Sequence, residues 1–134
     1  MTRVELMQQH IVSAERDVVI GVDDCGPWVV QWIRLACGRE VKFPRYRTRE
    51  EAYGLIKTAG SLVALVDPLL ADVGITRTDY PEYGDVVVVR LSKRDVAGIM
   101  CDGGLVLFRG EERGATFINP GKFLLAAWRV PDNG

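Results

Sequence analysis

Hydrophobic side chains recur with helical spacing through the first half of the chain. The spacing predicts an amphipathic helix over residues 3–17, followed by a break at Gly21. A second apolar face predicts a helix that starts in the segment Asp23–Pro27 and ends at Gly38, because glycine is typical of a helix C-terminus. These two faces consist of Val4, Met7, Ile11, Ala14 and Val18, and of Trp28, Val29, Trp32, Ile33 and Ala36.

Two shorter helices are predicted after an extended loop at residues 43–47. Thr48 and Glu51 have the spacing of a capping box, which opens a helix to about Lys57. Another helix begins at Gly60-Ser61. We expect Pro68 to break or kink it, because proline removes a backbone donor and clashes with the preceding turn. A polar loop over residues 76–84 follows.

The pattern changes to that of strands after Gly84. The β-branched run Val86–Val89 predicts a buried strand, and Asp102-Gly103-Gly104 predicts a tight hairpin turn. Further strands are expected over residues 96–101, 105–108, 115–118 and 123–128. Helices followed by strands indicate an α+β fold, with N-terminal helices packed on a mainly antiparallel β-sheet. We expect one domain over residues 1–130 and a tail over residues 131–134.

Composition narrows the classes of protein. The 134 residues, 48% hydrophobic and 26% charged, fit one globular domain. Seventeen basic and eighteen acidic residues give a net charge of −1, which does not favour nucleic-acid binding. The sequence has neither a long uncharged apolar run nor an apolar signal core, so we expect no membrane span and no signal peptide.

The cysteines do not form a metal or disulfide pattern. Cys25, Cys37 and Cys101 are odd in number and lack CxxC spacing, so free thiols in a reducing compartment are expected. Asp95 and Asp102 are too isolated to suggest a metal site. We therefore expect no cofactor and no metal.

Cys25 is the most informative residue for function. It falls at a predicted helix start, where backbone N–H groups and the helix dipole favour a thiolate, and a thiolate is the nucleophile of acyl transfer. The alternative interpretation is a small buried apolar side chain, which is the usual role of a free cysteine.

A series of short motifs around Cys25 resembles the NlpC-type papain-fold cell-wall peptidases. In that family an Asp-Cys-Ser-Gly segment carries the nucleophile, and a His-Val-Gly-Ile strand carries the base. The resemblance covers roughly residues 18–110 and implies a papain-like fold with Cys25 at the position of the nucleophile. The matching segments, in order, are Asp24-Cys25, Phe43-Pro44-Arg45, Gly84-Asp85-Val86-Val87, Val96-Ala97-Gly98-Ile99 and Asp102-Gly103.

A closer resemblance is to uncharacterised proteins encoded among bacteriophage tail genes. They share the Asp-Cys start, Tyr46-Arg47-Thr48, Gly84-Asp85-Val86 and the end Ala127-Trp128-Arg129-Val130. The resemblance implies a tail-tip protein of a phage or prophage, with other tail-tip or hub proteins as partners. Its implied location is the virion tail, or the host cytoplasm during assembly.

The catalytic base of the peptidases is missing. Its position falls on Val96, or on Ala97 with a one-residue slip, and the third polar position falls near Leu107. The only histidine, His10, lies outside the motifs and is expected to be a polar helix residue. Three carboxylates near the motifs are candidates to replace the base: Asp23, Asp24 and Asp85. Asp24 is expected instead to cap the helix, and Asp85 to form the turn before a strand.

Two other groups of residues are not expected to form a binding site. A basic cluster, in which acidic residues are interspersed, predicts a solvated loop: Arg39, Lys42, Arg45, Arg47 and Arg49. The tryptophans are expected to pack in the core rather than to anchor a partner: Trp28, Trp32 and Trp128.

We therefore favour a non-catalytic structural or assembly protein of a phage tail tip. The alternative is a cysteine peptidase or amidase acting on peptidoglycan, with Cys25 as nucleophile and a base from His10 or another subunit. A third hypothesis is a module that binds a small ligand or peptidoglycan in the former active-site groove.

Overall fold

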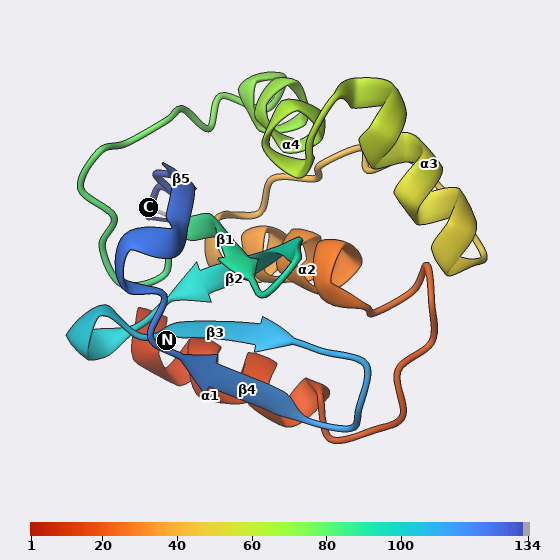
Figure 1. Cartoon of the computed structure of the whole chain (residues 1–134). Coiled ribbons are helices and arrows are strands. Elements are labelled where there is room, and N and C mark those ends of the chain that lie inside the picture. The colour runs from red at the N-terminus through yellow and green to blue at the C-terminus, as the bar shows by residue number, and fades with distance from the viewer. Residues whose placement is uncertain (133–134) are drawn as a thin grey trace.

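A computed structural model describes residues 1–132 and confirms the α+β class, with helices preceding an antiparallel sheet (Figure 1). The helices are α1 (Arg3–Ser13), α2 (Cys25–Cys37), α3 (Arg49–Ala59) and α4 (Leu62–Ala71). The strands are β1 (Val86–Leu91), β2 (Arg94–Met100), β3 (Val106–Arg109), β4 (Ala115–Ile118) and β5 (Leu124–Trp128). In Figure 1, α3 and α4 lie together at the top, α1 lies at the bottom, and α2 runs between them.

The five strands form one sheet in the order β4-β3-β2-β1-β5, with antiparallel neighbours throughout. A tight hairpin with Ser92 at a φ of 56° joins β1 to β2. The predicted turn at Asp102–Gly104 is a short 3-10 turn between β2 and β3. The last strand, β5, returns to pair with β1 at the opposite edge from β4.

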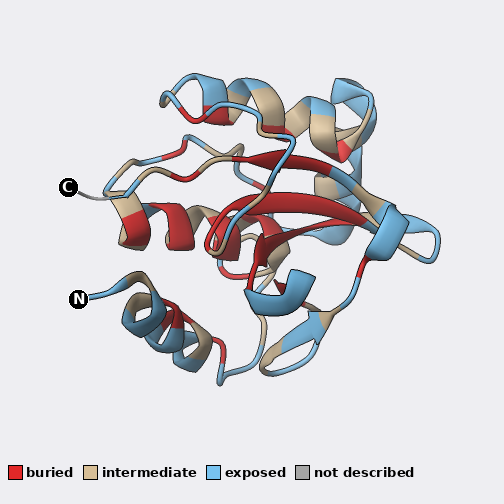
Figure 2. Cartoon of the chain, turned by 90° about the vertical axis from the view of Figure 1, so that its left-hand side faces the viewer, coloured by how far each residue is buried: buried red, intermediate tan, exposed pale blue. Residues whose placement is uncertain are grey.

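One face of the sheet packs against α1, α2 and α4 and forms the main core. Figure 2 shows all buried residues in red. The three tryptophans belong to this core and are at most 1% exposed, as predicted. The indole N–H groups of two of them also have hydrogen-bond partners. The Trp32 N–H donates to the Gly84 carbonyl at 2.8 Å, and the Trp128 N–H donates to the Asp67 carboxylate at 2.8 Å.

The other face forms a second core to which no helix contributes. Its members are strand residues only, namely Val87, Val89, Val96, Met100, Val106, Phe108 and Ala127, with Leu91, Ile118 and Leu124 at the margin. The curved strands therefore cover one another's side chains. Gly98 in β2 permits this close approach, because a Cβ there would lie 2.6 Å from Val106 Cγ1 and 2.9 Å from the Leu107 carbonyl oxygen.

The first helix ends four residues before the predicted position. α1 stops at Ser13, and Ala14 follows as its C-cap. The carbonyl of Ala14 accepts hydrogen bonds from the Gly114 N–H and the Arg109 guanidinium, and that of Arg16 accepts another from Arg109. These bonds replace the bonds of a further helical turn.

The expected break of the helix at Pro68 does not occur. α4 continues through Pro68 to Ala71. Val66 and Leu70 are buried on either side of the proline, and the Asp67 carboxylate is bound by Trp128. The carbonyl that loses its partner belongs to Ala64, which is exposed, so water can replace the missing N–H.

The two ends of the chain lie together. The Arg3 guanidinium donates to the carbonyls of Val130 and Pro131 at 3.0 and 2.8 Å, and it pairs with Asp132 at 2.9 Å. The rest of the predicted tail, residues 133 and 134, lies outside the described residues.

Within residues 1–132, no single helix is long and apolar enough to cross a membrane. The pair α3 and α4 meets that length and composition only when taken together, with a bend of 79° between the two helices.

Candidate functional site

Cys25 borders a pocket of about 100 Å³ that lies between the start of α2, the helices α3 and α4, and the start of β2. Its walls are mainly apolar and consist of Ile20, Phe43, Ala52, Leu55, Ile56, Leu62, Leu65 and Val96. Its polar side chains are Asp24, Tyr46, Arg49, Tyr53, Arg94, Asp95, Arg109 and Glu111. The helix α3 supplies one wall, although none of its residues is fully buried.

The helix that carries Cys25 begins and ends where the sequence predicts. Asp24 is its N-cap residue, and Gly38 ends it in the left-handed region at a φ of 74°. Gly26 follows the cysteine because a Cβ there would lie 2.9 Å from Phe43 Cζ. The glycine thus makes room for the Phe43 ring that lines the pocket.

Asp24 binds the neighbouring loop instead of capping the helix with its side chain. One carboxylate oxygen accepts the Gly21 N–H at 2.8 Å, and the other accepts the Tyr46 hydroxyl. The backbones of Gly21 and Tyr46 lie so close that a Cβ on Gly21 would be 2.0 Å from the Tyr46 carbonyl oxygen. Burial, and then the hydrogen bond to Asp24, raise the pKa of Tyr46. Sequence reasoning found Tyr46 only as part of a motif and did not connect it with Asp24.

The environment of Cys25 favours a neutral thiol. Burial is the largest effect and raises the pKa of the Cys25 thiol, and the charge of Asp24 raises it further. The Ala97 N–H, the Arg94 charge and the Gly26 N–H act in the opposite direction but do not outweigh burial. The expectation that a helix start alone favours a thiolate is therefore not met here.

The positions that would hold the catalytic base and its partner are apolar and buried. The backbone N–H of Ala97 faces the Cys25 thiol, and the Ala97 side chain is 3% exposed. Val96 packs in the second core, and Leu107 is wholly buried in the main core. The structure thus brings Cys25 and the predicted base position together, but that position offers no proton acceptor.

His10 is a core residue, so the expectation of a polar, solvent-facing histidine is wrong. It is 3% exposed, and its ring stacks on Trp28 with centroids 4.1 Å apart. Because the carbonyl of Trp28 can only accept, His10 Nε2 carries the proton and donates to it at 2.9 Å. Burial lowers the pKa of His10 to about 4. His10 is therefore a neutral ring whose Nε2–H is bound to α2 rather than to the thiol.

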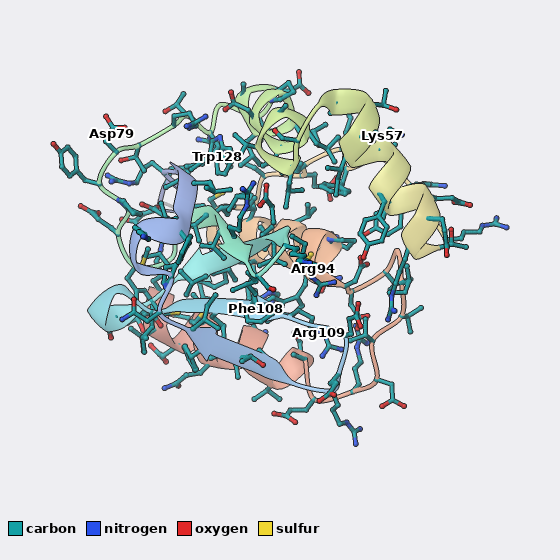
Figure 3. The ribbon with its side chains drawn as sticks, viewed as in Figure 1. Lys57, Asp79, Arg94, Phe108, Arg109 and Trp128 are labelled. Atoms are coloured by element: carbon teal, nitrogen blue, oxygen red, sulfur yellow. The ribbon has the colours of Figure 1, made fainter. Side chains whose placement is uncertain are left out.

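Asp23 is held in a buried ion pair with Arg109, a residue that sequence reasoning missed. Both side chains are at most 1% exposed, and Arg109 lies inside the molecule near Arg94 in Figure 3. The Asp23 carboxylate accepts the Val19 N–H and binds Arg16 and Arg109, whereas Arg109 also donates to the carbonyls of Ala14 and Arg16. Burial alone would raise the pKa of Asp23, but these partners outweigh it and lower the pKa. No local sequence signal marks an arginine in β3 as buried.

Asp85 has the structural role predicted for it, and it also holds the end of the chain. Its carboxylate accepts the N–H of Glu82, which forms the turn before β1. It also accepts the Arg129 guanidinium at 2.8 Å and the Val130 N–H at 3.0 Å. Asp23 and Asp85 are therefore both occupied by structural bonds.

The basic cluster divides into two parts. Lys42, Arg45 and Arg47 are exposed, as expected of a solvated loop. Arg39 instead donates to the Val73 carbonyl at 2.8 Å, and Arg49 forms an ion pair with Glu111 at 3.4 Å beside the pocket.

The acidic and sulfur side chains do not gather into a metal-binding arrangement anywhere in residues 1–132. All three cysteines are free thiols. Asp95 forms an ion pair with Arg90 at 2.8 Å, and Asp102 is exposed in its turn.

No curated protein gives a match. Residues 3–130 match a family described as a domain of unknown function, DUF6950. This match covers nearly the whole chain, and the protein therefore belongs to the DUF6950 family.

Proposed function

We propose that this chain is a non-catalytic structural or assembly protein of a phage or prophage tail, built on a papain-like fold. One observation carries the non-catalytic part of the proposal. The backbone N–H of Ala97 faces the Cys25 thiol, and the expected base position, Val96 or with a one-residue slip Ala97, carries an apolar, buried side chain in either case.

The chemistry of acyl transfer is not supplied by the neighbours of the thiol. A cysteine nucleophile needs a proton acceptor within hydrogen-bond reach. The Ala97 backbone presents an N–H, which only donates. The nearest carboxylate, Asp24, already accepts the Tyr46 hydroxyl and the Gly21 N–H. Its negative charge also opposes formation of a thiolate.

Support for the tail assignment comes from the motifs in the sequence. Two of those motifs carry contacts that hold the fold together. Tyr46 binds the Asp24 carboxylate, and Arg129 binds Asp85 and the Tyr80 carbonyl. The resemblance to phage tail-region proteins therefore involves residues that stabilise the fold. Because the resembling proteins are encoded among phage tail genes, we propose other tail-tip or hub proteins as the partners.

A cysteine peptidase or amidase that acts on peptidoglycan is the second candidate. The observation in its favour is that Cys25 borders a pocket rather than lying in the main core. Because His10 is enclosed and bound to the Trp28 carbonyl, the base would have to come from another subunit.

Genetic complementation separates the two candidates. The gene would be deleted from a phage or prophage that carries it, and the defect complemented with wild type or with Cys25→Ala. We expect both to restore intact tails, with the protein detected in tails or tail intermediates by mass spectrometry. Restoration by wild type alone, together with muropeptide release that Cys25→Ala lacks, would establish the hydrolase instead.

A further inference from the structure

Two arginines beside the Cys25 pocket share a single carboxylate. Arg94 Nη1 lies 3.2 Å from Glu111 Oε1, and Arg49 Nη2 lies 3.4 Å from Glu111 Oε2. The three side chains are 44–50% exposed, so they form the solvent-facing rim of the pocket. Figure 3 shows Arg94 on the side of the sheet that faces α3. Each guanidinium has five N–H donors, and one carboxylate oxygen leaves most of them available.

The other carboxylates of the pocket are already bound. Asp24 accepts from Tyr46 and Gly21, and Asp95 accepts from Arg90 at 2.8 Å. The buried Arg109 is paired with Asp23. The rim side chains Arg49, Arg94 and Glu111 carry two positive charges and one negative charge. Asp24, next to Cys25, keeps its negative charge because both of its donors are neutral, so an anionic group is favoured at the rim and not beside the thiol.

The interior of the pocket is mainly apolar, whereas its rim is charged. Eight apolar side chains form the walls, and the volume of about 100 Å³ suits a short aliphatic or aromatic group. Phe43 packs against Gly26 at the start of α2, and Leu62 and Leu65 of α4 also line the pocket. A polar ligand without an apolar part would leave these walls without a partner.

We propose that the pocket binds an apolar group that carries a carboxylate. The carboxylate lies between Arg49 and Arg94, and the apolar group occupies the space beside Cys25. Glu111 is then an internal competitor that holds the two arginines when the pocket is empty. Its half-exposed ion pairs are weak, so a ligand displaces it readily. The inference rests on the proposed function, because it assigns the pocket to binding rather than to turnover.

The ligand chemistry has two sources, and two probes distinguish them. The first probe is hexanoate, which represents a free carboxylic acid and is compared with hexanol. The second probe is an N-acetylated tripeptide ending in leucine, which represents a protein C-terminus and is compared with its C-terminal amide. Binding to the full chain would be measured by shifts of backbone amide signals around the pocket. We expect each acid to bind about tenfold more tightly than its neutral counterpart. Tighter binding of the peptide acid identifies the C-terminus of a partner protein, and tighter binding of hexanoate identifies a free carboxylic acid.

Charge variants test the rim directly. Arg94→Gln should weaken acid binding about tenfold, and Glu111→Gln should strengthen it several-fold because the competitor is removed. The matched controls are Glu112→Gln and Arg113→Gln, in the exposed loop that carries Glu111, and both should change acid binding little. Thermal unfolding would confirm that each variant is folded.

Equal binding of acids and neutral counterparts would overturn the inference, as would unchanged binding by Glu111→Gln. Such a result would leave the proposed function intact if Cys25→Ala still restores tails. Cleavage of the peptide by wild type but not by Cys25→Ala would instead overturn the proposed function. The inference of charge-dependent binding would still hold in that case.

Discussion

The thiol of Cys25 at the start of α2 faces the backbone N–H of Ala97 in β2. This relationship joins the helix start to the central sheet at the base of the pocket. The amide favours the thiolate more than the charge of Asp24 opposes it, but burial is the largest effect and raises the pKa of the thiol. The neighbour that faces the thiol is therefore a backbone donor and not a proton acceptor.

Cys25 should be alkylated slowly near neutral pH. In a Cys37→Ser, Cys101→Ala variant, we expect the rate to rise only above about pH 8.5, the ordinary thiol pKa, because burial raises the pKa of Cys25. The measurement is the rate of labelling by iodoacetamide as a function of pH. The same variant unfolded in guanidinium chloride is the control and should titrate at the ordinary value. A plateau reached below pH 8 in the folded protein would contradict this prediction.

Acid should destabilise the protein through His10. Its pKa is about 4 in the folded chain and about 6.5 when unfolded, so protons bind preferentially to the unfolded state. The stability associated with neutral His10 is complete above pH 6.5. It is lost as the pH falls from 6.5 to 4, by about 3 kcal/mol in total.

The control for this effect is His10→Gln, whose amide can still donate to the Trp28 carbonyl but does not titrate. Urea unfolding of both proteins between pH 4 and pH 7.5 gives the comparison. Parallel pH dependence in the two proteins would show that His10 is not the source.

Removal of the buried guanidinium of Arg109 should be strongly destabilising. Arg109→Leu leaves the Asp23 carboxylate without its buried partner and removes the guanidinium donors of the Ala14 and Arg16 carbonyls, of which Ala14 keeps the Gly114 N–H. We expect a loss of about 3–5 kcal/mol in the free energy of unfolding, measured with urea. Arg90→Leu removes an exposed partner of Asp95 and should cause a much smaller loss. Similar losses in the two variants would contradict the structural role assigned to Arg109.

Two glycine substitutions should have opposite effects. Gly98→Ala places a Cβ 2.6 Å from Val106 Cγ1 and 2.9 Å from a backbone oxygen, so we expect a loss of about 1–3 kcal/mol. Gly54→Ala lies within α3, where no atom is within 4 Å of the new Cβ, and it should stabilise by about 0.5–1 kcal/mol. The difference in melting temperature between the two variants provides the measurement. A stabilising Gly98→Ala would mean that β2 and β3 do not approach so closely.

Features set by neighbouring residues could be predicted from the sequence. Gly38 ends α2 and the valine run of residues 86–89 forms β1, because a glycine C-cap and β-branched side chains act locally. The Thr48 cap is likewise present, and its hydroxyl accepts the Glu51 N–H at 3.1 Å. The reciprocal bond of Glu51 goes to the Arg47 N–H instead of the Thr48 N–H.

Features set by distant residues could not be predicted. α1 ends early because the Ala14 carbonyl binds Arg109, 95 residues later in the chain. His10 is buried because Trp28 stacks on it, which no helical periodicity shows. For the candidate site, Cys25 was identified from its place before a helix. The arginine pair on the rim was not identified, because Arg49, Arg94 and Glu111 meet only in the folded chain.

The position of α3 has a consequence for how the pocket admits a ligand. This helix forms one wall, and none of its residues is fully buried. Among the helices α1 to α4, α3 is the one without a fully buried residue, so its contacts with the rest of the molecule are made by partly exposed side chains. A small outward tilt of α3 would separate Arg49 from Glu111 and widen the entrance, while the two cores stayed closed. If α3 moves in this way, wider ligands enter the pocket without a change in either core.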